Sequence, residues 1–494
     1  METPLEGFAA LVDQFIADWD IPGAAVCVVK DGAVVHSEGY GYRDVARQLP
    51  VTAETQFAIG SASKAFTCLT MGILVDQGKL AWDTPVRDYM PDFRLHDPVA
   101  TERMTPRDLV IHNSGLPRHD LAWYNSPRNR HELLKALRHL PPTHDFRSFM
   151  QYQNLMFMTA GILVERLSGQ TWEEFAAEHI FKPLEMDESN FTVAELAARE
   201  NRALAYHRSD EAVAEIPYRN IDNVAPAGSI NSTVRDMAQW LRLHLGHIDG
   251  VVSEETLAEL HTPQMVIRSM PGLDEFTKFA EISKMSYCLG WFTNTYRGYR
   301  MIHHGGGIDG FASMVTFFPE LDLGAVVLTN RDGHMGHMSL IMNLCDRYAG
   351  LEPLPWSKRF LEAMEEAQAA MIAEAREKLV ADRIPDTAPS RAPAGYAGTY
   401  AHPGYGPIAV TVEDGRLNFR FNNMDFGADH YHFDTFTIAR KEDLLPLPAT
   451  FYSGVDGKIE RLELPIEPTM APLPFQRQPD DNGNGDDVGT AAES

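Results

Sequence analysis

The chain is poor in cysteine, has no long apolar run and carries no excess of positive charge. Its four cysteines lie far apart without C-x-x-C pairing, so we predict no disulfide, metal or nucleophilic role for them. A membrane-spanning helix is excluded because no run of about 18 apolar residues is present. With 43 basic and 69 acidic residues, the formal charge of −26 argues against nucleic acid and anionic lipid as partners.

The N-terminus lacks the basic and apolar regions of a secretory signal. It reads Met-Glu-Thr-Pro-Leu-Glu-Gly, and we therefore expect a cytoplasmic protein. What the sequence does contain is an ordinary globular composition, with 44% hydrophobic and 23% charged residues in a chain of 494. That length allows two or three domains and a large buried core.

Strand signals at both ends of residues 1–352 bracket a mostly helical middle. Two apolar runs flank Asp31-Gly32, which predicts a hairpin, and more strands are expected between residues 285 and 329. This order predicts an α/β (α+β) sandwich, in which distant segments complete one antiparallel sheet flanked by helices. Three further segments follow: a connecting helix and linker at 353–390, a small antiparallel β-barrel at 391–476 and a disordered tail at 477–494.

Ser61 and Lys64 form an S-x-x-K tetrad at the start of a predicted helix that ends at Gln77 and is capped by Gly78. Side chains three residues apart share one face of a helix, so the lysine can reach the serine hydroxyl. The positive end of the helix dipole disfavours a second positive charge there, which favours a neutral amine. We therefore predict Ser61 as a nucleophile and Lys64 as its general base. Taken alone, the tetrad also fits an N-cap serine followed by a solvated lysine.

Two later stretches carry chemistry of the same kind. Tyr152 and Asn154 form a Y-x-N motif near the start of a helix, and His304 opens a glycine-rich segment that includes Gly306 and Gly307. Glycines allow the backbone to approach a ligand closely. Singly, a half-buried tyrosine and a loop histidine beside a turn would also explain these residues.

In this order, S-x-x-K, Y-x-N and H-x-G resemble the motifs of the penicillin-binding-protein-like serine hydrolases, which include class C β-lactamases. The resemblance covers about Pro4 to Gly350 and extends to His112-Asn113-Ser114-Gly115-Leu116 and to Pro226–Ser232. The third motif resembles that of D-aminopeptidases. The C-terminal β domain resembles the lipocalin-like barrel that several such enzymes carry, where it can narrow the catalytic cleft. This family resemblance implies a sandwich of the β-lactamase/transpeptidase type.

The resemblance also implies residue roles. Ser61 would form the acyl-enzyme with Lys64 supporting its deprotonation, and Tyr152 would pass a proton to the leaving group. Asn154 would hydrogen-bond the substrate amide, and the oxyanion hole would be the backbone N–H groups of Ser61 and Gly307.

His304 stands where penicillin-recognising relatives carry the lysine of K-T-G, and we expect it to act in catalysis beside the substrate-binding Gly306 and Gly307. A histidine with an ordinary pKa of about 6.5 is mostly neutral near pH 7. The site would then attract a substrate carboxylate only weakly, which predicts poor β-lactam turnover.

These observations predict a serine hydrolase that acts, without a cofactor, on amide bonds of small peptides or D-amino-acid derivatives. A carboxylesterase on the same residues, a weak β-lactamase and a non-catalytic scaffold remain open. Arg118-His119-Asp120 reads as a surface loop, and His334 and His337 read as solvated histidines, since no carboxylate set completes a metal site. The expected partner is a small-molecule or short-peptide substrate. The sequence leaves the oligomeric state open, a homo-oligomer included.

Overall fold

The computed structural model describes residues 4–209, 212–270, 273–440 and 445–479. The chain divides into two compact units, residues 1–373 and 374–494. Most of the tail predicted at 477–494 lies outside the described residues. The predicted boundaries at 352, 390 and 476 stay predictions.

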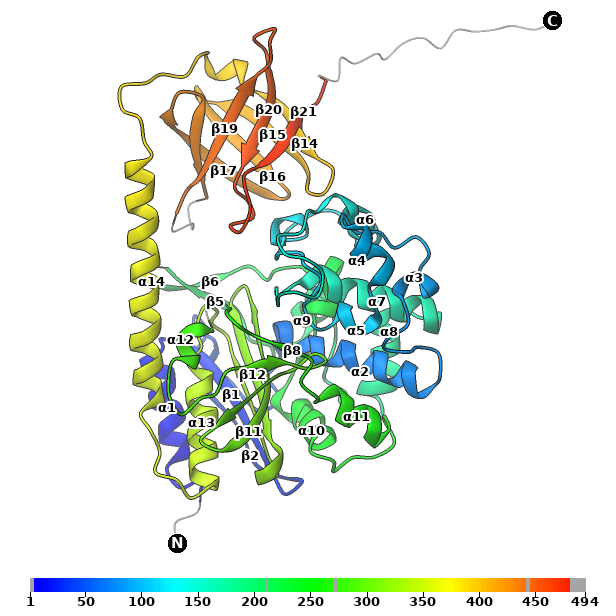
Figure 1. Cartoon of the computed structure of the whole chain (residues 1–494). Coiled ribbons are helices and arrows are strands. Elements are labelled where there is room, and N and C mark those ends of the chain that lie inside the picture. The colour runs from blue at the N-terminus through cyan, green and yellow to red at the C-terminus, as the bar shows by residue number, and fades with distance from the viewer. Residues whose placement is uncertain (1–3, 210–211, 271–272, 441–444, 480–494) are drawn as a thin grey trace, which may run out of the picture. The chain divides into compact units, whose positions relative to one another are not determined.

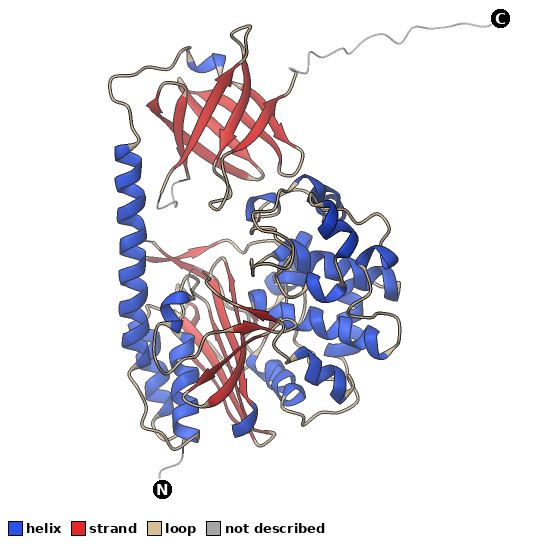
Figure 2. Ribbon diagram, in the orientation of Figure 1, coloured by secondary structure: helices blue, strands red, loops and turns tan. Residues whose placement is uncertain are grey.

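The first unit is built on one antiparallel sheet, shown in Figures 1 and 2. In the described residues its strand order is β3-β2-β1-β13-β12-β11-β10-β9-β8. These strands are β1 (Gly23–Lys30), β2 (Ala33–Asp44), β3 (Leu49–Pro50), β8 (Met265–Val266), β9 (Ser286–Tyr287), β10 (Phe292–Tyr296), β11 (Tyr299–Ile308), β12 (Phe311–Phe318) and β13 (Leu323–Thr329).

Segments from the two ends of this unit meet in the middle of the sheet. Strand β1 pairs with β13 from Ala24 opposite Thr329 to Lys30 opposite Leu323. The predicted hairpin joins β1 to β2 through Asp31 and Gly32, whose φ angles of 50° and 73° are both left-handed, as a two-residue hairpin turn requires. The prediction that distant segments complete one antiparallel sheet is therefore confirmed.

Helices cover both faces of this sheet (Figure 1). One face packs a hydrophobic core against α1 (Phe8–Asp18), α13 (His337–Tyr348) and the start of α14 (Trp356–Ala381). The other face meets α10 (Val234–His244) and the turn that precedes α2 (Ser63–Asp76). Since both faces are covered, β1 is buried at every residue except Lys30.

Along the chain, the remaining α-helices and strands of the first unit lie between β3 and β8, except α12, which follows β8. They are β4 (Phe57–Ala58), α3 (Val86–Tyr89), α4 (Pro98–Arg103), α5 (Pro106–Leu109), α6 (Arg130–Ala136), α7 (Asn154–Ser168), α8 (Trp172–Ala176), α9 (Val193–Ala198), β5 (Ala205–Arg208), β6 (Val213–Ile216), β7 (Asn231–Ser232), α11 (Glu254–Leu260) and α12 (Asp274–Thr277). Among the described helices, none combines the length and apolar character needed to cross a bilayer. The four cysteines are buried and unpaired.

The second unit contains a closed antiparallel barrel, as predicted. Its strands are β14 (Gly398–His402), β15 (Gly406–Glu413), β16 (Arg416–Phe421), β17 (Met424–His432), β18 (Thr435–Ala439), β19 (Leu447–Ser453), β20 (Ile459–Leu464) and β21 (Leu473–Arg477). Alternate residues point inward, and aromatic rings are among those that fill the interior. Tyr396 and Tyr400 both pack on Phe451, which also contacts Phe419 and Phe436.

Candidate active site

Ser61 lies in a short 3-10 turn, Gly60–Ala62, that continues directly into α2. The predicted helix therefore begins as a tighter turn and ends, as expected, before the left-handed Gly78. Gly60 has a φ of +52°, and a Cβ there would stand 2.8 Å from the backbone nitrogen of Gly307. Glycine thus lets the turn approach β11 closely. Ser61 is partly exposed and lines a cavity of about 200 Å³.

The amine of Lys64 is fully buried and has three polar neighbours. Its Nζ lies 3.0 Å from Ser61 Oγ, 2.8 Å from Asn154 Oδ1 and 2.7 Å from the carbonyl oxygen of Ala227. The amide and carbonyl oxygens can only accept hydrogen bonds. A neutral amine has two N–H groups for them, which leaves its lone pair for the Ser61 hydroxyl. With a neutral amine, the Ser61 hydroxyl would be the donor of this hydrogen bond.

Burial is also the main influence on the pKa of this lysine. It lowers the pKa of Lys64 well below its usual range; the positive charge of Arg118 lowers it further, while Asp120 acts in the opposite direction. The sequence argument expected a neutral amine because of the helix dipole. The direction of the pKa shift agrees with that expectation, and desolvation is its largest cause.

Tyr152 lies against the same two side chains. Its ring centroid is 4.7 Å from Lys64 Nζ, and its hydroxyl lies near Ser61. Burial raises the pKa of Tyr152, so the side chain is a protonated phenol at neutral pH. The ring packs on His112 at 4.3 Å, and His112 Nδ1 accepts a hydrogen bond of 3.0 Å from the backbone N–H of Gln153. His112, from the first flanking signature, therefore holds the Y-x-N segment in place.

Asn154 begins α7 and faces inward. Its Oδ1 accepts from Lys64 at 2.8 Å, and its Nδ2 donates to Asp120 Oδ1 at 3.4 Å. The amide oxygen is thus engaged with Lys64. Its predicted contact with a substrate amide stays a prediction.

The third motif lies within strand β11 rather than in a loop. Strand β10 pairs with β11 only as far as His303, and the turn that carries Ser61 packs beside the rest of β11. A Cβ on Gly306 would stand 1.8 Å from the carbonyl oxygen of Ile59, whereas a Cβ on Gly307 would meet nothing within 4 Å. Gly306 therefore permits the close approach, and Gly307 lines the cavity.

His304 is 1% exposed and does not line the cavity. Its Nδ1 lies 2.6 Å from the carbonyl oxygen of Gly305, and its Nε2 lies 3.1 Å from the hydroxyl of Tyr287. Because a carbonyl only accepts, Nδ1 carries the proton and Nε2 accepts from the tyrosine. Burial lowers the pKa of His304 to about 3. The histidine is therefore neutral and engaged at both nitrogens, so its predicted catalytic role stays a prediction.

Arg118 and Asp120 lie in a loop, as the sequence predicted, and half of the Arg118 side chain is exposed, whereas His119 between them is buried. Both Arg118 and Asp120 line the cavity with Ser61, and Arg118 Nε donates to Asp120 Oδ2 at 2.5 Å. The guanidinium carbon of Arg118 lies 5.2 Å from the centroid of the Tyr152 ring. In the sequence, the feature nearest to this pair is the H-N-S-G-L signature, which ends at Leu116, two residues before Arg118.

A second polar group at the cavity was not predicted. Asp309 follows β11 and lines the cavity. It accepts a hydrogen bond of 2.5 Å from the hydroxyl of Tyr124 and two of 3.1 Å from Arg219. These hydrogen bonds connect three separate segments, which carry Tyr124, Arg219 and Asp309, at this wall of the cavity.

The two histidines outside the motifs differ from expectation. His334 and His337 are 5% and 2% exposed, so they are not solvated, and His334 Nε2 lies 2.9 Å from Thr329 Oγ1. Across the described ranges, no group of three or more His, Cys, Asp or Glu side chains is placed to hold a metal ion.

Comparison with known proteins is consistent with this geometry. A family model described as "Beta-lactamase" matches residues 8–344, and one described as "Domain of unknown function (DUF3471)" matches residues 382–477. "Unguisins hydrolase ungD'" of Aspergillus campestris (strain IBT 28561) is 29% identical, over 94% of this chain and 90% of the relative. "Protein flp" of Staphylococcus aureus (strain MW2) is 26% identical, over 65% of this chain and 62% of the relative.

Solved structures resemble the chain in fold. The octameric penicillin-binding protein homologue from Pyrococcus abyssi has a TM-score of 0.64 at 21% identity, covering 93% of this chain and 98% of that one. SurE, solved with D-Leu, has a TM-score of 0.55 at 19% identity, covering 96% and 99%.

Proposed function

The chain belongs to the beta-lactamase family, and from this premise we propose that it is a serine hydrolase cleaving amide bonds in small peptides or D-amino-acid derivatives. The observation that carries the proposal is the set of contacts of Lys64. Two acceptors hold its N–H groups and leave its lone pair to the Ser61 hydroxyl. A lysine held in this way needs no rearrangement before it takes the serine proton.

Acylation follows from this arrangement. Ser61 Oγ attacks the substrate carbonyl carbon as its proton passes to Lys64. The tetrahedral oxyanion receives hydrogen bonds from the backbone N–H groups of Ser61 and Gly307. Tyr152, a phenol beside Ser61, protonates the departing amine and is reprotonated from Lys64. Amine leaves, and the acyl group stays on Ser61 as an ester.

Deacylation reverses these roles. A water molecule loses a proton to Lys64 and attacks the ester carbonyl. The acid product departs as Ser61 Oγ regains a proton. A positioned general base contributes about 10²–10⁴ in rate to each step.

Substrate class is proposed from the third motif and the relatives. His304 offers no fixed positive charge to a substrate carboxylate, because it is neutral and buried. We therefore expect weak β-lactamase activity at most. A hydrolase stands among the similar proteins, and one structure of the same fold was solved with D-Leu, which favours D-amino-acid derivatives as the first compounds to try.

The test begins with intact-mass spectrometry after a fluorophosphonate, with Ser61→Ala as control. Hydrolysis of D- and L-alanine p-nitroanilides and of short-chain p-nitrophenyl esters follows. Labelling that the control loses, together with anilide cleavage, is the expected result. Labelling with ester turnover alone would replace the proposal with a carboxylesterase. No labelling would mean a non-catalytic scaffold.

Two further properties stay predictions. Location in the cytoplasm rests on the sequence expectation alone. A homo-oligomeric state is worth testing by light scattering on a sizing column, because a homologue of this fold is octameric.

A further inference from the structure

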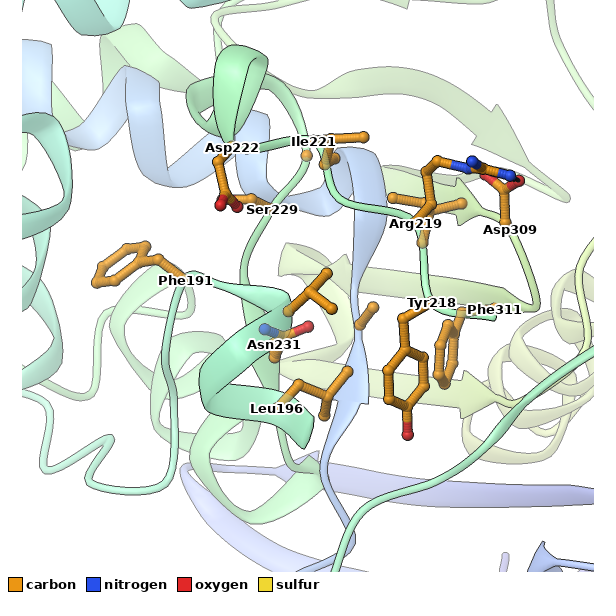
Figure 3. A pocket seen from close by; sticks show the side chains of 14 residues that line it. Phe191, Leu196, Tyr218, Arg219, Ile221, Asp222, Ser229, Asn231, Asp309 and Phe311 are labelled. Carbon is orange, nitrogen blue, oxygen red and sulfur yellow. Dashed lines mark hydrogen bonds and ion pairs between the residues drawn. The ribbon is translucent and has the colours of Figure 1, made fainter. Parts of the chain in front are cut away.

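A second, smaller cavity adjoins the one that contains Ser61 (Figure 3). The two cavities share four lining residues, Ile221, Gly228, Ile308 and Asp309. Gly228 also lies close to the turn that carries Ser61, since a Cβ on it would stand 3.6 Å from the carbonyl carbon of Gly60. A substituent on an acyl group attached to Ser61 can therefore extend from the larger cavity toward the smaller one.

The smaller cavity has room for one small group. Its volume is about 20 Å³, against about 200 Å³ for its neighbour, and a volume of about 10–15 Å³ on this measure holds one water molecule. Its walls are fixed. Tyr218 stacks on Phe311 at 6.0 Å and donates to the carbonyl oxygen of Ala203 at 2.8 Å. Phe191 stacks on Phe181 at 4.8 Å.

The lining is apolar apart from a few groups, and two of these have an unused hydrogen-bonding atom. Ser229 is 7% exposed, and its Oγ has no hydrogen-bond partner in the part of the chain that the structure describes. The same is true of the buried Oδ1 of Asp222, whose other carboxylate oxygen accepts from Asn220. In Figure 3 these two residues lie across the view from Tyr218 and Phe311. A buried polar atom without a partner is unfavourable, so a ligand group that pairs with it gains binding free energy.

We infer that this cavity is a specificity subsite, which receives a short side chain ending in a hydroxyl on the substrate residue that acylates Ser61. Serine carries such a hydroxymethyl group. Its hydroxyl would accept a hydrogen bond from Ser229 Oγ–H, and its methylene would contact the apolar wall. Alanine fits without the hydrogen bond, and leucine exceeds the space. The inference rests on the proposed acyl-enzyme function.

The experiment compares kcat/KM for the p-nitroanilides and the ethyl esters of glycine, alanine, serine and leucine in both enantiomers. The acyl group is the same in each anilide and ester pair, so the side-chain preference is read from whichever is cleaved. We expect serine to exceed alanine by about 5- to 10-fold, the worth of one hydrogen bond, and leucine to fall at least about 10-fold below alanine.

Two variants separate the subsite from the catalytic residues. Ser229→Ala should reduce the serine-to-alanine ratio to about 1–2 while alanine still exceeds leucine. Leu196→Ala, which removes a lining side chain that is 1% exposed, should raise leucine relative to alanine. Fluorophosphonate labelling of Ser61 should proceed at the wild-type rate in Ser229→Ala.

The outcomes distinguish the two proposals. Ester cleavage without anilide cleavage contradicts the amide function but still measures the subsite. Equal rates for alanine, serine and leucine, or a serine preference that survives Ser229→Ala, would overturn the subsite while the hydrolase stands. If neither substrate class is cleaved, both proposals fall.

Discussion

Replacing Arg118 with glutamine should shift the pH dependence of kcat/KM toward higher pH. Lys64 Nζ and the guanidinium carbon of Arg118 lie 4.7 Å and 5.2 Å from the centroid of the same tyrosine ring, so they are at most 9.9 Å apart. With an effective dielectric constant of about 20, two unit charges at that distance interact by about 1.7 kcal/mol, or about 1.2 pKa units. Half of the Arg118 side chain is exposed, and screening by water reduces this to between about 0.3 and 1 unit.

The direction of the pH shift follows from the positive charge of Arg118. Arg118 disfavours the ammonium form of Lys64 and lowers its pKa, so Arg118→Gln raises that pKa, and the neutral base is present only at higher pH. The acidic limb of the kcat/KM profile, measured from about pH 5 to about pH 10, should move upward by that amount. Arg118→Lys, which keeps the charge, should restore the wild-type profile.

Asp120→Asn is the matched control. Asp120 raises the pKa of Lys64, so removing its charge should shift the acidic limb downward. Opposite shifts in the two variants would support the electrostatic account. If the Arg118→Gln limb stays in place, or if both variants shift in the same direction, the reasoning is refuted.

Three further predictions address the packing and the proton path. Gly306→Ala places a Cβ 1.8 Å from a facing carbonyl oxygen and should lower the free energy of unfolding, measured in urea, by about 1–3 kcal/mol. Gly307→Ala, where a Cβ meets open space, should leave that free energy unchanged. Equal losses in the two variants would contradict the packing argument. Asn154→Asp puts a carboxylate 2.8 Å from Lys64 and should stabilise the ammonium form of the lysine. At neutral pH kcat/KM should therefore fall by about 10²–10⁴ and recover at alkaline pH. A loss that does not depend on pH would mean that the substitution acts other than through the protonation of Lys64. Tyr152→Phe removes the proton donor and should reduce anilide cleavage far more than p-nitrophenyl ester cleavage, because p-nitrophenolate leaves without a proton. A uniform loss across both substrates would exclude that role.

The residues that sequence reasoning predicted together are those whose spacing is dictated by local geometry. Ser61 and Lys64 are three apart and share a face, and their side chains are in contact. Asp31 and Gly32 adopt the left-handed conformation that their hairpin requires. In such cases a few neighbouring residues contain the whole physical cause.

The parts that were missed depend on which distant segment lies opposite. Asp309 binds Arg219, 90 residues away, and nothing near either residue indicates the other. His304 is buried because β11 continues through the glycine-rich motif as a strand, whereas the glycines alone suggested a turn.

The pairing of β1 with β13 has a consequence for the synthesis of the protein. Ala24 and Thr329 are partners, and with translation at about 5–20 residues per second the first leaves the ribosome roughly 15–60 s before the second. During that interval β1, an apolar strand buried on both sides in the finished sheet, has no neighbour at one edge. Exposed strand edges recruit other chains, so the nascent chain should depend on chaperones most strongly in this interval. Slower translation downstream of β1 should therefore lower the soluble yield.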